Sequence, residues 1–165
     1  MVVGNDHVVA DSTFTNNLFE SSDAGVVYSE SDWTFRGNQI RNSSFAGVHS
    51  LYYPRDPAQC AKHAQKGGWC GDWVKALHLD NQVAGFLIEG NLFENYSYAL
   101  DANGGGAHTI RGNTFGACHN DSCTTTLNIH TMGNSHLPCK DLCHVRTYLL
   151  TYLFDLQVRL KIINS

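Results

Sequence analysis

The sequence predicts an all-β protein in which short parallel strands stack on one another in successive coils of the chain. A hexapeptide pattern recurs at intervals near 22 residues, and a second, alternating pattern follows it at a fixed distance. Helical repeats are disfavoured, because the 3.6-residue apolar stripe is absent and Gly-Asn pairs would interrupt a helix. The 15 glycines, 14 asparagines and 3 prolines agree with stacked strands joined by left-handed corners, since Pro lacks the amide hydrogen of a paired strand.

The hexapeptide reads apolar-x-(Gly/Asn)-Asn-x-apolar. Its copies are Phe14–Phe19, Phe35–Ile40, Ile88–Phe93 and Ile110–Phe115. The second Asn recurs after 21, 53 and 22 residues, so the long interval holds two repeats and an insertion. We expect these asparagines to form a structural corner column, each amide bonding to the Asn of the next coil. Its members are Asn17, Asn38, Asn91 and Asn113. The apolar ends should form a buried ladder of Phe19, Ile40, Phe93 and Phe115.

The second pattern places a small residue before an apolar one, then any residue, then another apolar or small one. It occurs at Gly25–Tyr28, Gly47–Ser50, Ala76–Leu79, Ala99–Ala102 and Thr126–Ile129. This alternation is typical of strands, so one set of side chains should point inward and the next set outward. The predicted inward ladder is Val26, Val48, Leu77, Leu100 and Leu127. The predicted outward columns are Val27, His49, His78, Asp101 and Asn128, and then Ser29, Leu51, Asp80, Asn103 and His130.

A long insertion, residues 51–74, flanks the outward columns. It carries flat aromatic faces and positive charges, which together suit an anionic sugar chain. The residues concerned are Tyr52, Tyr53, Trp69, Trp73, Arg55, Lys62, Lys66 and, just beyond, Lys75. The alternative interpretation is that these aromatic side chains only cover a gap in the stack of strands.

The Gly-Asn-x-Phe repeat, with Ala76–Asn81 and Gly104–Gly106, resembles the right-handed parallel β-helix proteins of the pectin-lyase-like superfamily from Val8 to Ile129. The resemblance implies a right-handed parallel β-helix of about five coils over residues 1–143. Residues 144–165 would be a non-repeat segment, either a cap or an artefact of a mis-assigned gene boundary. Because family members usually have many more coils and an N-terminal capping helix, we expect the chain to be a fragment.

The family resemblance also implies a substrate groove on an exterior strand face, in polysaccharide lyases, glycoside hydrolases and epimerases, and it includes members without assigned activity. The candidate catalytic residues are Asp80, Asp101, His78 and Lys75. A hydrolase needs two carboxylates, Asp80 and Asp101, whereas a lyase needs a base such as Lys75 or Arg55 and a cation on the uronate. The candidate substrate-binding residues are His49, Tyr52, Tyr53, Arg55, Trp73, Asn103, Asn128 and His130.

Two metal sites are conceivable on the same face. Asp80, Asp101 and Asn103 offer the hard oxygen ligands that Ca²⁺ prefers, so Ca²⁺ is the candidate cofactor. His49, His78 and Asp101 could instead bind Zn²⁺, although outward polar residues of a strand need no metal.

Six cysteines fall into three local pairs, 60–70, 118–123 and 139–143, which favour disulfides and an extracellular, secreted location over a zinc site. The net charge of −4 argues against a nucleic-acid partner, and no apolar run reaches the ~20 residues of a membrane-spanning helix. Two functions remain: binding or processing of a polysaccharide or other glycan along the outward face, and a non-catalytic structural or adhesive repeat module.

Overall fold

The computed structural model describes residues 1–30, 32–51, 73–117, 125–130 and 159–162, with side chains described as far as residue 117. Every regular element in these segments is a strand, and none is a helix. The strands are β1 (Val8–Ala10), β2 (Thr13–Asn17), β3 (Gly25–Glu30), β4 (Gln39–Arg41), β5 (Ser44–Val48), β6 (Lys75–Asp80), β7 (Leu87–Glu89), β8 (Leu92–Tyr96), β9 (Tyr98–Asn103), β10 (Thr109–Phe115), β11 (Thr125–His130) and β12 (Arg159–Ile162). The predicted all-β class is therefore confirmed.

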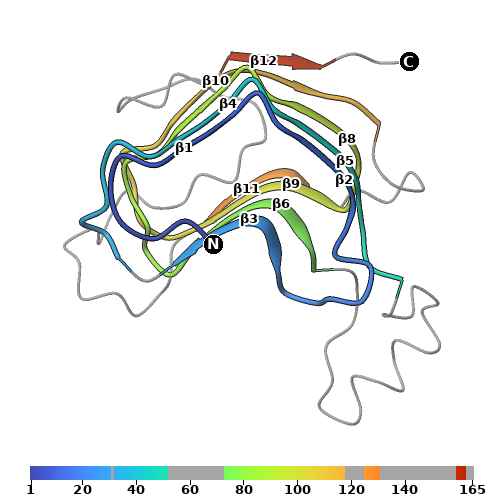
Figure 1. The fold of residues 1–165 in the computed structure, drawn as a ribbon, viewed down its shortest axis with the longest axis horizontal. Helices are drawn as coiled ribbons and strands as arrows, with labels where there is room; N and C mark the ends of the chain where they lie inside the picture. The colour runs from blue at the N-terminus through green and yellow to red at the C-terminus, as the bar shows by residue number, and fades with distance from the viewer. Residues whose placement is uncertain (31, 52–72, 118–124, 131–158, 163–165) are drawn as a thin grey trace, which may run out of the picture.

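All strand pairs are parallel and form two sheets. One has the order β1-β4-β7-β10-β8-β5-β2 with β12 also on β10, and the other has the order β11-β9-β6-β3. Strand β10 pairs with β7 through residues 109–111 and with β8 through residues 114–115, so the larger sheet bends between them. In Figure 1 this bent sheet forms the upper chevron, and the four-stranded sheet arches beneath it. The chain thus visits three runs of strands in the same order on each pass, which agrees with the predicted parallel stacking.

The excess of Gly and Asn serves the corners between these runs. The corner before β1, β4, β7 and β10 has positive φ at Asp6, Gly37, Gly85 and Ala107. The corner between the two halves of the bent sheet has positive φ at Asp11, Asn42, Gly90 and Gly112. A third set lies within β2, β5 and β8, at Asn16, Gly47 and Asn95. Gly, Asn and Asp tolerate this left-handed geometry best, so the corner prediction from composition holds.

A buried polar ladder follows the second corner. The Ser43 amide donates to Asn91 Oδ1 (3.0 Å) and the Asn91 amide donates to Asn113 Oδ1 (2.9 Å), which confirms the predicted stacking of Asn91 and Asn113. The Ser12 amide extends the ladder by donating to Ser43 Oγ (3.2 Å). The column is therefore Ser12, Ser43, Asn91 and Asn113.

The predicted places of Asn17 and Asn38 in that column are wrong. Asn17 pairs with Val48 at the end of β2. Asn38 precedes β4 at the first corner, where its Oδ1 accepts the His7 amide at 3.0 Å. The hexapeptide around Asn38 matches the others in residue type but spans a different corner, because Gly-Asn pairs suit any left-handed turn.

Four stacked phenylalanines form the core ladder of the bent sheet. Their centroids are 4.9, 5.2 and 5.1 Å apart and their planes differ by 8–10°. They are Phe14, Phe45, Phe93 and Phe115. The predicted membership of Phe19 and Ile40 is wrong: Phe19 packs on the His49 ring at 4.7 Å, and Ile40 pairs with Ile88.

In the four-stranded sheet the register aligns Val27 with Leu77, Leu77 with Leu100, and Leu100 with Leu127. The predicted ladder is correct at the last three positions, and Val26 is wrong by one residue. Val48 is wrong because it ends β5, which pairs with β2 and β8 rather than with β6. Because of the same one-residue shift, the neighbour of Asp80 on β3 is Glu30 and not the predicted Ser29.

Candidate functional site

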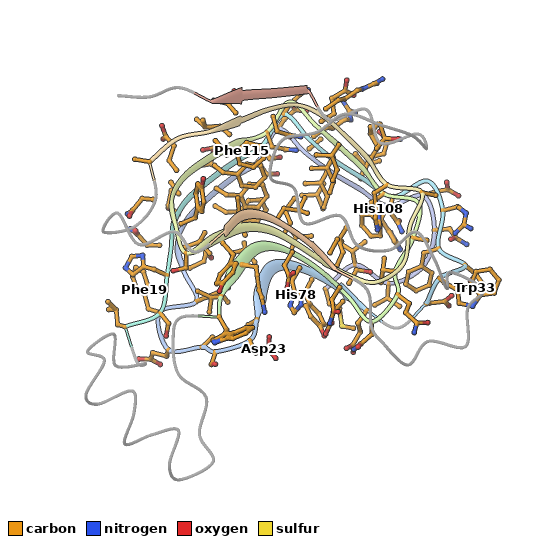
Figure 2. The ribbon with its side chains drawn as sticks, turned by 180° about the vertical axis from the view of Figure 1, so that it is seen from behind. Phe19, Asp23, Trp33, His78, His108 and Phe115 are labelled. Carbon is orange, nitrogen blue, oxygen red and sulfur yellow. The ribbon has the colours of Figure 1, made fainter. Side chains whose placement is uncertain are left out.

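Four of the polar side chains predicted for the outer face of the four-stranded sheet lie together there: His78, Asp80, Asp101 and Asn103. The register pairs His78 with Asp101 and Asp101 with Asn128, and in the next outward position it pairs Asn103 with His130. Figure 2 places His78 and Asp23 on the side of this sheet opposite the core that holds Phe115. The site therefore lies outside the core, on neighbouring strands β3, β6 and β9.

A row of ionisable side chains in mutual contact runs across β6 and β9. Lys75 Nζ lies 2.5 Å from Asp23 Oδ1 and 3.8 Å from Asp101 Oδ2. His78 Nε2 lies 3.4 Å from the same Asp101 oxygen and 3.7 Å from Asp80 Oδ1. Lys75, His78 and Asp101 are only 2, 3 and 5 % exposed. Buried charges persist when they are paired, so this cluster is a connected electrostatic unit.

Asp80 accepts hydrogen bonds through both of its carboxylate oxygens. Its Oδ1 accepts the Asn81 amide at 2.9 Å and Asn103 Nδ2 at 2.8 Å, and its Oδ2 accepts Asn81 Nδ2 at 3.2 Å. The Tyr28 hydroxyl lies 2.6 Å from Glu30 Oε2 and 3.1 Å from Asp80 Oδ2. One phenolic hydrogen is thus held between two carboxylates, which fixes Asp80 beside His78.

Burial and the Lys75 ammonium lower the pKa of His78, and Asp101, Asp80 and Asp23 oppose them. The net shift is downward, so the ring is neutral near pH 7. Burial, the hydrogen bond to Glu30 and the charge of Asp80 raise the pKa of Tyr28, which keeps its proton. His78 Nδ1 is buried without a hydrogen-bond partner among the described residues.

Aromatic side chains border the cluster. The rings of Trp73 and Tyr98 stack at 6.3 Å with an interplanar angle of 25°, and Lys75 Nζ lies 5.8 Å from the Trp73 ring centroid. Trp73 is 36 % exposed, so part of its ring faces solvent. A flat, partly exposed aromatic surface beside carboxylates can bind the apolar face of a sugar ring.

This arrangement can support acid–base chemistry. Because one oxygen of Asp80 and one of Asp101 lie within 3.7 Å of the same His78 nitrogen, they are at most about 7 Å apart. Glycosidase carboxylate pairs work at separations of roughly 5–9.5 Å. A neutral imidazole between them can relay a proton.

The remaining predicted residues are less informative. His49 follows β5 and is not in the His78 column, so the predicted alignment is wrong. Tyr52, Tyr53 and Arg55 lie outside the described residues, as do all six cysteines and most of the insertion. Asn128 and His130 are placed by backbone register alone.

Sequence reasoning missed four contributors to the site. These are Asp23, Tyr28, Glu30 and Tyr98. Had the alternation of β3 been aligned on Val27, Tyr28 and Glu30 would have fallen beside His78 and Asp80, as the register now shows. Asp23 and Tyr98 carry no such signal.

The described residues contain no group of three or more His, Cys, Asp or Glu side chains arranged to hold a metal ion. Asn103 turns its amide nitrogen toward Asp80, so its oxygen is not directed at the same point as that carboxylate. The Ca²⁺ prediction for Asp80, Asp101 and Asn103 gains no support from this geometry.

Comparison with known proteins finds no match among family models, curated proteins or solved structures. Within the described part of the chain, no helix has the length and apolar character needed to cross a membrane.

Proposed function

We propose that this chain is a parallel β-helix domain that binds or processes a polysaccharide on the outer face of β3, β6 and β9. The observation that carries the proposal is the placement of Asp80 and Asp101 on either side of His78 Nε2, next to the Trp73–Tyr98 stack. An aromatic platform positions a sugar ring, and a carboxylate pair with a neutral imidazole supplies acid and base groups.

The strand order supports the β-helix assignment. Three runs of parallel strands are visited in constant order, and left-handed corners, a Ser or Asn of the polar ladder and a stacked Phe ring repeat on each pass. Such a stack presents rows of outward side chains on neighbouring strands, ~4.8 Å apart. A linear polymer is a natural ligand for a row of this kind, and an extracellular location would suit it.

Among the processing reactions, hydrolysis fits the geometry better than lyase chemistry. The two carboxylates needed for hydrolysis are present. A lyase would use Lys75 as the base, but its ammonium is held between Asp23 and Asp101. In the hydrolytic scheme Lys75 instead pairs with Asp101, which takes a proton from the attacking water, and Asp80 or His78 donates a proton to the leaving oxygen.

The test is incubation of the purified full chain with a panel of neutral, acidic and amino-sugar polysaccharides, with and without Ca²⁺. Release of reducing ends reports hydrolysis, ultraviolet absorbance of unsaturated uronate ends reports cleavage by a lyase, and calorimetry reports binding. We expect binding that Asp80→Asn and Asp101→Asn weaken at least tenfold, and reducing ends that both variants abolish. Glu89→Gln, in an exposed ion pair on the other sheet, is the matched control. Absence of binding to every polysaccharide would overturn the proposal.

The second candidate function is a non-catalytic structural or adhesive module. The low solvent exposure of the ionisable side chains on β6 and β9 favours it. Lys75, His78 and Asp101 are nearly inaccessible, so their pairing could serve only to hold β6 and β9 together. In that case Asp101→Asn would lower the free energy of unfolding while the wild-type chain binds no glycan.

A further inference from the structure

The described charges on the proposed glycan-binding face are unbalanced. Strands β3, β6 and β9 and the turn before β3 carry four carboxylates and one ammonium group. The carboxylates are Asp23, Glu30, Asp80 and Asp101, and the ammonium group is Lys75. His78 adds no charge while it is neutral. The face is therefore acidic although its neighbouring aromatic rings suit a sugar.

The single cation of these three strands is not open to an anionic ligand. Lys75 is 2 % exposed, and its Nζ is already close to Asp23 and Asp101. By contrast, Asp23 and Asp80 keep 72 and 17 % of their side chains exposed. A polyuronate approaching this face would meet carboxylates first, and like charges repel.

A second observation points to a ligand that brings hydrogen-bond donors. The His78 ring is directed between Asp80 and Asp101 and is 97 % buried, and its Nδ1 has no partner among the described residues. Burying an unsatisfied polar atom is costly, and functional sites are where such atoms are retained. Tyr28 also offers only one hydrogen to the two carboxylates that it contacts. The Glu30 and Asp80 carboxylates thus share one phenolic donor, and the partly exposed Asp80 and the exposed Asp23 can accept further hydrogen bonds from a ligand.

We propose that this face is selective for a positively charged amino-sugar chain, whose ammonium groups pair with Asp23, Glu30 and Asp80 while a pyranose ring stacks on Trp73 and Tyr98. The inference rests on the proposed function and names its ligand class. Charged hydrogen bonds to carboxylates are stronger than neutral ones and fix the orientation of the bound sugar. Lys75 serves as an internal counter-ion that lets Asp101 remain buried.

The experiment compares three oligosaccharides of matched length by calorimetry on the full chain at slightly acidic pH and low salt. The probes are a glucosamine oligomer, its N-acetylated form and an oligogalacturonate. We expect the glucosamine oligomer to bind about tenfold more tightly than the N-acetylated form, and the oligogalacturonate not to bind. Raising the salt concentration should weaken only the first interaction.

Two variants test the assigned carboxylates without touching the buried ones. Asp23→Asn and Glu30→Gln should each weaken binding of the glucosamine oligomer about fivefold and leave binding of the N-acetylated form unchanged. The Asp23 variant should have the larger effect, because it also releases Lys75 from its closest partner. Glu89→Gln should change neither affinity.

The outcomes separate the two proposals. If the N-acetylated oligomer or the oligogalacturonate binds as tightly as the glucosamine oligomer, the charge selectivity is wrong and the glycan-binding proposal stands. If none of the three oligosaccharides binds, the amino-sugar assignment is wrong, and the glycan-binding proposal is also wrong only if no polysaccharide of the larger panel binds. The amino-sugar assignment would also be overturned if poly-lysine of similar charge bound as tightly as the glucosamine oligomer and Trp73→Ala left the affinity for that oligomer unchanged. The face would then recognise positive charge alone.

Discussion

Asn113 Oδ1 accepts two hydrogen bonds from Asn91, which precedes it by 22 residues in the chain. The donors are the Asn91 backbone amide at 2.9 Å and its Nδ2 at 3.0 Å. Both residues are 1 % exposed, and Asn113 Nδ2 also donates to the Ile88 carbonyl at 2.9 Å. One side chain thus satisfies polar groups that the fold removes from water.

Replacing Asn113 by alanine should lower the free energy of unfolding by about 3 kcal/mol, because it leaves buried donors on Asn91 and a buried carbonyl on Ile88 without partners. Urea unfolding followed by circular dichroism measures the change. Asn5→Ala is the control, since Asn5 accepts one bond, from the Arg36 amide, at an exposed site. It should cost less than about 1 kcal/mol. Equal costs for the two variants would show that the buried ladder does not stabilise the fold.

Ala107 has φ of +56° at a corner where the earlier passes use Asp6, Gly37 and Gly85. A left-handed backbone is unfavourable for alanine, so Ala107→Gly should raise the free energy of unfolding by roughly 0.5–1 kcal/mol. Ala99→Gly provides the opposite case, because Ala99 lies fully buried within β9. That variant should lower stability by about 1 kcal/mol. A loss of stability in both variants would rule out strain at Ala107.

His108 should make stability depend on pH. Burial lowers the pKa of its ring to about 4, against the opposing effect of a hydrogen bond with the Val83 backbone, and its Nδ1 accepts the Phe86 amide at 3.3 Å. The unfolded chain binds a proton near pH 6.5 and the folded chain only near pH 4. The contribution to stability is therefore complete above pH 6.5 and is lost as the pH falls, by roughly 3 kcal/mol near pH 4.

Urea unfolding at several pH values should show a smaller loss in His108→Asn than in the wild type. Asn at this corner can keep the acceptor, as Asn38 Oδ1 does for the His7 amide at the same corner two passes earlier in the chain. Parallel pH profiles for the two proteins would disprove the role of His108.

Lys75 and Asp101 should move the pKa of His78 in opposite directions. Lys75→Gln removes a positive charge that lowers this pKa, so the pKa should rise, although burial continues to depress it. Asp101→Asn removes a negative charge and should lower it further. Nitrogen-15 NMR titration of the imidazole measures both shifts, and the same spectra show whether each variant is folded. Arg111→Gln, whose partner is Glu89 on the other sheet, should leave the titration unchanged. A shift of the same sign in the two charge variants would contradict the proposed electrostatics.

Local patterns predicted the parts of the structure that depend on local properties. The spacing of Asn91 and Asn113 predicted the repeat correctly because no insertion separates them and each is followed by a Phe two positions later. Alternation around Leu77 and Leu100 likewise predicted which side chains face the core. It failed at Val48, because an apolar residue after Gly looks the same in either sheet.

The residues of the candidate site were likewise predicted only in part. His78, Asp80 and Asp101 were predicted to share a face, and they do. Neither the burial of Lys75 nor its bond to Asp23 could be predicted, since those two residues are separated by 51 intervening positions and by an insertion. The hydrogen bond between Tyr28 and Asp80 could be predicted only from the register of β3 on β6. The predicted ladder placed Val26 instead of Val27 beside Leu77 and therefore gave the wrong register.

The sequence by itself determined that this chain forms strands joined by left-handed corners, because φ preferences and alternation belong to single residues and their nearest neighbours. Only the tertiary structure decided which strands pair and in which register. Parallel pairing is set by hydrogen bonds between residues more than twenty positions apart, and it brings one lysine, four carboxylates and a neutral histidine to a common face.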